Sequence, residues 1–166
     1  MRISGYIGTV GIVGMILANS AFANDRGVVN PSCKPEPENQ CAFGELRKAS
    51  LAGKDLHSGN YDTARMDEAN LAGADLSDSS MQIVNLTRAN LAKANLKRVH
   101  LHAANLSNAN LAEANLSGAT LTKASLRGAN LSGANLLKAS LQGADLSGAT
   151  WINGRVCAEG SIGGCK

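Results

Sequence analysis

The sequence predicts an all-β solenoid built from five-residue units, and three observations support this prediction. An apolar residue recurs at every fifth position from Leu46 to Trp151, which makes 22 consecutive centres, of which 18 are leucine. Two positions before the centre, the residue is alanine in 16 of the 22 units. This period matches neither the helical period of about 3.6 residues nor the alternation of a strand. It matches a chain that turns a corner in every unit, with the alanine and the centre pointing inward.

The unit consists of alanine, a small polar residue that is often asparagine or aspartate, an apolar centre and two variable residues. It resembles the repeat of the pentapeptide-repeat family over residues 44–153. The resemblance implies a right-handed quadrilateral parallel β-helix with four pentapeptides in each coil. On that geometry residues 20 apart stack directly, and the 22 units make about five and a half coils. The rod would be roughly 26 Å long at the spacing of paired strands, and both of its ends would need caps.

The start of the repeat departs from the pattern. Lys54 stands at an inward position, and Tyr61, Met66 and Met81 replace leucine as centres. We therefore expect the first one or two coils to be distorted and Lys54 to turn out to solvent. Gly, Ser, Lys, Arg, Glu and Ala all occur at the two positions after each centre, so the pattern leaves both of them free. Trp151, the last centre, is expected to cap the final coil as a large flat plate.

Residues 1–23 have the pattern of an export signal. Arg2 precedes an apolar run of about 16 residues, and Ala21 and Ala23 place small residues where signal peptidase cleaves. The run is short for a membrane span of about 20 residues, so a retained anchor is the weaker alternative. We expect cleavage after Ala23, no membrane span in the mature chain, and a periplasmic or secreted protein.

Four cysteines flank the repeat in two pairs, and the repeat itself contains none. An N-terminal cap, residues 24–43, carries Cys33 and Cys41, and a C-terminal cap, residues 154–166, carries Cys157 and Cys165. An even number of cysteines in an exported protein indicates disulfides, with three possible connectivities. Pairing within each cap is favoured, because the rod holds its two ends too far apart for a disulfide. A four-cysteine zinc site is the weaker alternative, because it requires shorter spacings and adjacent ends.

One side of the predicted rod has few long side chains. After its centres stand Ala52, Ala72, Ala92 and Ala112, and before them stand Asn70, Asn90, Asn110 and Asn130. In one interpretation this side is structural, with the asparagines forming a ladder that satisfies backbone groups of the turns. In the other interpretation it is an interaction face that a rigid partner approaches closely.

Candidate sites for metal binding or catalysis are weak. His100 and His102 flank an inward leucine, but their neighbours one coil away are Ser, Gln and Thr, which are poor zinc ligands. Asp55 and Asp75 stack on another side, where mild repulsion is favoured over acid–base chemistry. The sequence contains no phosphate-binding loop and no HExxH motif. We expect no catalytic residues, no metal and no cofactor.

These observations favour a non-enzymatic structural or protein-interaction module outside the cytoplasm, which binds an unknown protein partner or associates with itself. Members of the resembled family that mimic double-stranded DNA and protect DNA gyrase suggest one alternative. They need a strongly acidic surface and a cytoplasmic location, whereas this chain has a net charge of +3 that falls to +2 without Arg2. Nucleic acid is therefore not expected as a partner. Glycan or ice binding by a flat face is a further alternative, although Thr120 and Thr122 form the only Thr-x-Thr rank.

The predicted compartment determines the covalent state of the mature protein. Exported material should begin at Asn24 and contain two disulfides, because export places the thiols in an oxidising space. Intact mass with and without reductant measures both properties. A product that keeps Met1, or four free thiols in exported material, would contradict the predicted location.

Overall fold

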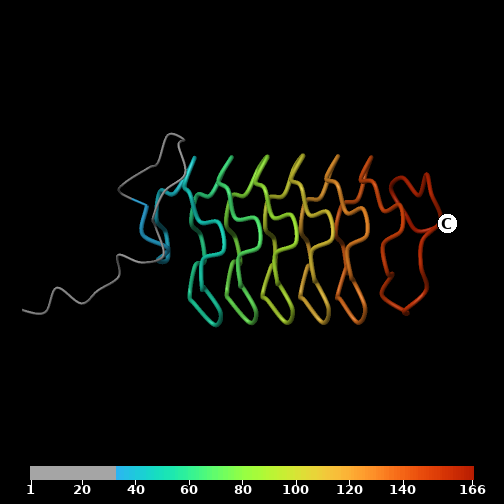
Figure 1. The fold of residues 1–166 in the computed structure, drawn as a ribbon, viewed down its shortest axis with the longest axis horizontal. Helices are drawn as coiled ribbons and strands as arrows, with labels where there is room; N and C mark the ends of the chain where they lie inside the picture. The colour runs from blue at the N-terminus through green and yellow to red at the C-terminus, as the bar shows by residue number, and fades with distance from the viewer. Residues whose placement is uncertain (1–32) are drawn as a thin grey trace, which may run out of the picture.

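The computed structural model describes residues 33–166 of the chain. The predicted signal peptide, residues 1–23, and the first part of the predicted N-terminal cap lie outside the described residues. Within residues 33–166, no helix is long and apolar enough to cross a membrane. The described chain winds into a rod of stacked coils, with its first residues at one end and its last residues at the other (Figure 1).

The coils are joined by parallel β-bridges between residues 20 apart. The first bridge pairs Gln40 with Asn60 and the last pairs Asn130 with Thr150. One bridge occurs every five residues, at the residue before each centre, and between 33 and 166 none of them extends into a longer strand. Four pentapeptides therefore complete one turn around the rod. The number of about five and a half coils stays a prediction.

We name the four sides of the rod after residues that lie on them. Their centres are Leu51, Leu71, Leu91, Leu111, Leu131 and Trp151 on the alanine side; Leu56, Leu76, Leu96, Leu116 and Leu136 on the aspartate side; Tyr61, Met81, Leu101, Leu121 and Leu141 on the histidine side; and Leu46, Met66, Leu86, Leu106, Leu126 and Leu146 on the arginine side. The chain passes from the alanine side to the aspartate, histidine and arginine sides in that order.

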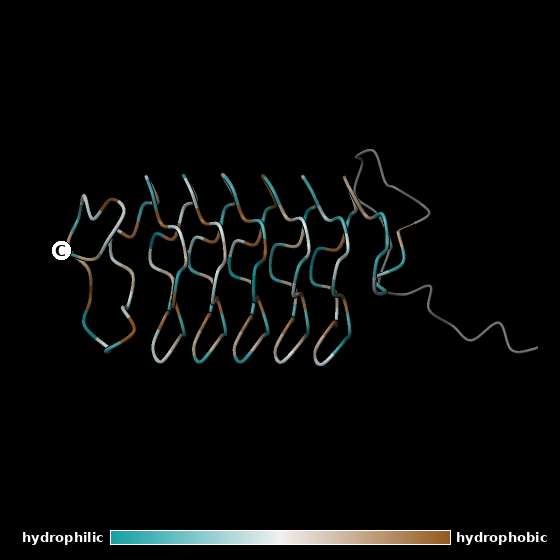
Figure 2. Ribbon diagram, turned by 180° about the vertical axis from the view of Figure 1, so that it is seen from behind, coloured by the Kyte–Doolittle hydropathy of each residue, from teal (hydrophilic) through white to brown (hydrophobic). Residues whose placement is uncertain are grey.

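The core of the rod is a column of leucines and alanines. Every centre from Leu46 to Leu131 is buried, as are the alanines two positions before them. Ser79 stands at one of these alanine positions, and its hydroxyl donates a 2.6 Å hydrogen bond to the carbonyl of Leu76. Apolar and polar segments recur at the same places in successive coils (Figure 2). Burial of each leucine contributes roughly 1.5–3 kcal/mol, shared between neighbouring coils.

Each corner is a two-residue turn of constant geometry. At every corner after Cys41 except the one that ends at Gly59, the N–H of the residue three after the centre donates to the centre's carbonyl, as Ala49 does to Leu46 at 3.1 Å. The second residue after the centre has a φ between 54° and 70° in every unit from Glu38 to Gly148. A type II turn requires this positive φ. Residue type varies at this position, as predicted, and 16 of these residues are not glycine, but the backbone is constrained to a positive φ. Most residues other than glycine, asparagine and aspartate bear a conformational cost of roughly 1–2 kcal/mol here.

The first coils are regular, so the predicted distortion is wrong. Lys54 is exposed, as predicted, while its backbone N–H keeps the hydrogen bond of the turn. Tyr61, Met66 and Met81 are fully buried at their centres. The sequence accommodates the tyrosine at Gly59, where a Cβ would lie 2.5 Å from a ring carbon of Tyr61. The ring occupies space that an alanine methyl fills elsewhere, so the backbone keeps its path.

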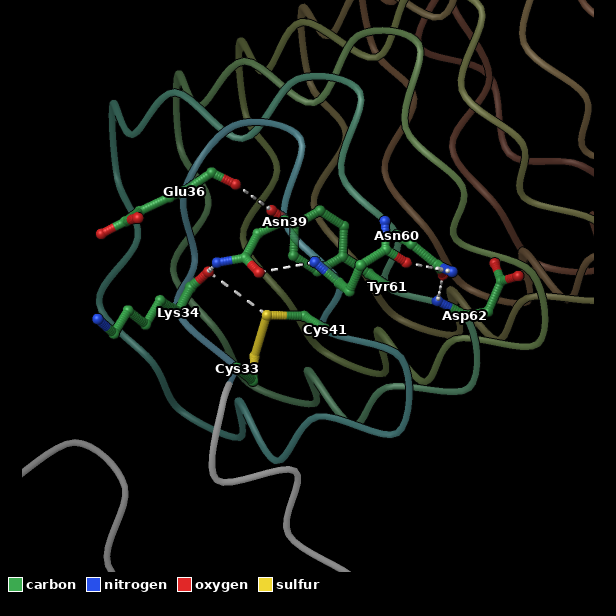
Figure 3. Close-up of a disulfide and its surroundings, with 9 residues drawn as sticks. Cys33, Lys34, Glu36, Asn39, Cys41, Asn60, Tyr61 and Asp62 are labelled. Carbon is green, nitrogen blue, oxygen red and sulfur yellow. Dashed lines mark hydrogen bonds between the residues drawn. A yellow bond between two sulfur atoms is a disulfide. The ribbon is translucent and has the colours of Figure 1, made fainter.

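The N-terminal end is closed by the disulfide between Cys33 and Cys41 (Figure 3). Cys41 is fully buried at a position equivalent to a centre, and its N–H donates to a carbonyl one coil further on at 2.7 Å. Gly44 leaves room for this disulfide, since a Cβ there would lie 3.0 Å from the Cys33 sulfur. The Tyr61 hydroxyl donates to the carbonyl of Glu36 at 3.3 Å. Burial raises the pKa of Tyr61 to about 12.

The C-terminal tail lies antiparallel across two sides of the last coil. Bridges join Asp145 to Ile162 and Thr150 to Val156. The disulfide between Cys157 and Cys165 closes the loop of the tail. The tail pairs with the arginine and alanine sides, through hydrogen bonds such as the 2.8 Å bond from the Leu146 N–H to the Ser161 carbonyl. Trp151 covers part of this end and remains partly exposed.

Gly59 and Tyr61 provide a test of how the core accommodates its irregular centres. Gly59→Ala should lower the free energy of unfolding by about 1–3 kcal/mol, because the new methyl group overlaps the ring. The same change in a Tyr61→Leu background should cost much less, because the double variant restores the common Ala-x-Leu unit. A double-mutant cycle measured by denaturant unfolding gives the coupling. Additive effects of the two changes would show that the ring does not occupy the alanine space.

Candidate functional site

The alanine side is mostly a smooth outer surface, from which the exposed side chains of Lys93 and Glu113 project as an ion pair. Ala52 is exposed, and Ala72, Ala92 and Ala112 are half-buried between neighbouring coils. Each of these alanines lies immediately after a buried centre and projects only a methyl group from the rod. A partner that approaches this side therefore meets methyl groups and turn backbone, with few side chains that would lose rotamer freedom on binding.

The asparagines of the alanine side form a continuous ladder. The side-chain amide of Asn90 donates to Asn70 Oδ1, that of Asn110 to Asn90, and that of Asn130 to Asn110, each at 3.3 Å. The same Oδ1 atoms accept backbone N–H groups in the following turns, as Asn90 does from Ala92 at 3.2 Å. The amides are thus committed within the rod, and they hold the turns in place. This geometry supports the structural interpretation of the asparagines.

A second ladder on the aspartate side shows that such rows are part of the scaffold. Asn95 donates to Asp75 at 2.9 Å, Asn115 donates to Asn95 at 3.5 Å, and Asn135 donates to Asn115 at 3.3 Å. Sequence reasoning identified only the row on the alanine side. Comparison of residues 20 apart finds both rows. The asparagines therefore do not distinguish the alanine side from its neighbour, and its small residues are its distinctive feature.

The histidine side shows no arrangement that would bind a metal. His100 is exposed and His102 is half-buried. Between residues 33 and 166, no three His, Cys, Asp or Glu side chains lie close enough together to hold a metal ion. All four cysteines are in disulfides, so none is available as a thiolate ligand.

The stacked carboxylates on the aspartate side have separate partners. Asp55 and Asp75 form a ladder pair, as their spacing of one coil requires. Asp55 contacts the His57 imidazole at 2.7 Å, and this hydrogen bond raises the pKa of His57. Partial burial would raise the pKa of Asp75, but hydrogen bonds from Ser77 outweigh burial and lower it. Asp75 therefore favours its charged form, which does not suit a general acid.

Opposite charges pair along the axis of the rod. Six ion pairs join residues 20 apart: Glu45–Arg65, Arg47–Asp67, Lys48–Glu68, Glu68–Arg88, Asp78–Arg98 and Lys93–Glu113. The hydrogen bond with Arg88 lowers the pKa of Glu68, and that with Arg98 lowers the pKa of Asp78. Such exposed pairs stabilise the fold only slightly. Their main effect is that each of these carboxylates is neutralised by a cation one coil away.

Two family models match the sequence. The model described as Pentapeptide repeats (8 copies) matches residues 114–150, and the model described as Pentapeptide repeat region matches residues 54–131. Together they cover more than half of the chain. No curated protein sequence matches it.

Several solved structures are similar to this chain. HetL, a pentapeptide repeat protein involved in heterocyst differentiation regulation from the cyanobacterium Nostoc, is 35% identical over 72% of this chain and 60% of its own, with a TM-score of 0.50. Rfr23 from the cyanobacterium Cyanothece is 34% identical over 58% of this chain and 63% of its own, with a TM-score of 0.41. A pentapeptide repeat protein from the Arabidopsis thaliana thylakoid lumen is 25% identical over 70% and 83%, with a TM-score of 0.38. The chain thus spans 60% and 63% of the lengths of HetL and Rfr23.

The asparagine ladder predicts a measurable contribution to stability. Asn110→Ala removes hydrogen bonds to both neighbouring coils and to the following turn, so it should lower the free energy of unfolding by about 1–2 kcal/mol. Glu113→Ala, an exposed change in the same coil, is the control and should have a small effect. Thermal unfolding of the two variants gives the comparison. Equal losses would show that the amide ladder contributes nothing specific.

Proposed function

This chain belongs to the pentapeptide-repeat family, and from that premise we propose that it is a non-enzymatic protein-interaction module that works outside the cytoplasm. The uniform surface of the rod is the observation that carries the proposal. From residue 40 to residue 150 every corner is the same two-residue turn, without an inserted loop. Enzymes hold small substrates in concave sites that are commonly lined by loops. A rod with uniform corners instead offers extended surfaces to another macromolecule.

The alanine side is the surface best suited to such a partner. Its methyl groups at Ala72, Ala92 and Ala112 recur in successive coils, and its asparagine amides are already hydrogen-bonded within the rod. Apart from the Lys93–Glu113 ion pair, a partner would bury little unsatisfied polar surface and immobilise few side chains.

The proposed location rests on the two disulfides and on the export pattern of the sequence. Both caps carry one disulfide, and disulfides persist mainly in oxidising compartments. These compartments include the periplasm and the exterior of the cell, which is where the signal pattern of residues 1–23 would direct the chain.

The two alternative functions have less support. A protein that mimics DNA needs uncompensated negative charge along its length, comparable to a row of phosphates. Here Asp67, Glu68 and Asp78 each pair with a cation one coil away, which removes that pattern. Glycan or ice binding is supported by only one Thr-x-Thr sequence, at Thr120 and Thr122.

Arginine substitutions on the alanine side test the proposed surface. The triple variant Ala72→Arg, Ala92→Arg and Ala112→Arg should lose captured partners from an extract of the exported fraction, because three long charged side chains then stand on the contact surface. Its fold should persist, because these residues lie on the outside of the coil. Affinity capture with mass spectrometry measures partners, and circular dichroism checks the fold.

The matched control places the same three charges on the opposite side, with Gln82→Arg, His102→Arg and Thr122→Arg. This variant should keep its partners. If the control loses them and the alanine-side variant keeps them, the interaction surface is the histidine side. If both variants keep all partners, the sides of the rod are not the binding surface.

A further inference from the structure

One side of the rod keeps polar side chains that have no partner within it. On the histidine side, two rows of outward residues run along three successive coils. We call these rows the polar face: His100, Thr120 and Ser140 in one row, and His102, Thr122 and Gln142 in the other. All six residues are exposed or half-buried. Imidazole, hydroxyl and amide groups can each donate and accept hydrogen bonds, so the face presents both functions to a ligand.

Most of the polar face is uncommitted. Four of its side chains have no hydrogen-bond partner among residues 33–166: those of His100, His102, Thr120 and Gln142. The hydroxyls of Thr122 and Ser140 lie 3.4 Å apart. The asparagine ladders differ, because their amides are bonded to the next coil, as Asn110 is to Asn90 at 3.3 Å. The polar face therefore keeps hydrogen-bonding capacity that the asparagine ladders have used.

The free charge around the polar face is positive. Lys123 directly follows Thr122 at one edge, and Lys138 precedes Ser140 by two residues at the other. Both lysines are exposed, and neither forms an ion pair with a residue between 33 and 166. The one acidic residue from 97 to 142 is Glu113, which pairs with Lys93 away from this face. The polar face thus has two free cations at its edges and no acidic side chain of its own.

We propose that the polar face binds an acidic polysaccharide, an extended chain of sugars that carry carboxylates. Sugar hydroxyls donate and accept hydrogen bonds, which matches the side chains of this face. The carboxylates pair with Lys123 and Lys138 at its edges, where charge complementarity selects an anionic chain over a neutral one. A sugar in an extended β-linked chain spans nearly the same length as one coil, which rises about 4.8 Å. Successive sugars therefore meet equivalent groups in successive coils.

Nucleic acid fits the polar face less well. Proteins that bind single strands stack the bases on aromatic side chains in a basic groove, and the face contains no Phe, Tyr or Trp. A duplex presents closely spaced phosphates that two lysines do not match. The sugar contact is additional to the protein contact proposed above, because the polar face and the alanine side are opposite sides of the rod. It does not depend on a regular row of Thr-x-Thr sequences.

A matched pair of oligosaccharides tests the proposal. The acidic probe is a β-linked tetrasaccharide of mannuronate, and its neutral counterpart is β-linked mannotetraose. In a nuclear magnetic resonance titration of the purified protein, the acidic probe should bind at least about fivefold more tightly than the neutral one, and added salt should weaken it. The largest amide shifts should lie at His100, His102 and Thr122.

Two charge-matched double variants locate the site. Lys123→Ala with Lys138→Ala should raise the dissociation constant of the acidic probe at least about fivefold, because it removes the cations beside the face. Lys34→Ala with Lys54→Ala removes the same charge from exposed lysines near the other end of the rod and should leave the dissociation constant unchanged. All four side chains are exposed, so the fold should persist in both variants.

Four outcomes would overturn the proposal. They are no binding of the acidic probe, equal affinities for the two sugars, equal weakening by the two lysine variants, and equal affinity for a single-stranded oligonucleotide, which would indicate attraction to any polyanion. Capture of protein partners should be unchanged in Lys123→Ala with Lys138→Ala and lost in the triple arginine variant of the alanine side. Failure of this proposal and failure of the proposed function are therefore distinguishable.

Discussion

The register of 20 residues per coil is the constraint on which the rest of the structure depends. Between the two ends of the rod, each bridging residue donates its N–H to a carbonyl one coil back, as Asn90 does to Ala69, and each centre donates to a carbonyl one coil forward, as Leu91 does to Asn110. Because of this ladder, the spatial neighbour of any side chain is the side chain 20 positions away. Leucine therefore packs on leucine, asparagine bonds to asparagine, and charges meet opposite charges. An inserted residue would move every later side chain out of its column, which explains why the repeat runs without interruption from residue 40 to residue 150.

Departures from the repeat in the core are matched by compensating changes close by. Tyr61 is tolerated because Gly59 gives up the alanine methyl, and the Cys33–Cys41 disulfide is tolerated because Gly44 does the same. Close-packed interiors permit such exchanges when total volume is kept. The first coils, which contain most of these exceptions, are consequently as regular as the later ones. The N-terminal end therefore accommodates its irregular residues by local changes in side-chain packing, and the path of the backbone does not change.

Many polar side chains on the rod already have partners within it, so few of its surfaces are left for contact. In the middle of the rod, amides such as Asn90 and Asn110 are committed to their neighbours above and below, and the axial ion pairs neutralise one another. The surfaces that keep capacity for contact are the methyl groups of the alanine side and the uncommitted side chains of the polar face.

The sequence by itself determined the inward phase of the repeat, because the period and the apolar character of Leu101 or Ala94 are properties of each unit alone. It also determined that Lys54 would leave the core, since a buried unpaired ammonium is too costly. The positive φ of the second corner residue could not be predicted from the sequence. Glycine, the usual sign of a positive φ, occupies only 7 of the 23 corners, and residues such as Ile83 and Lys123 adopt the same φ at the others. The charge pairs and the uncommitted side chains of the polar face were decided by tertiary structure. Both depend on which donors and acceptors meet between neighbouring coils, and only the folded backbone sets this.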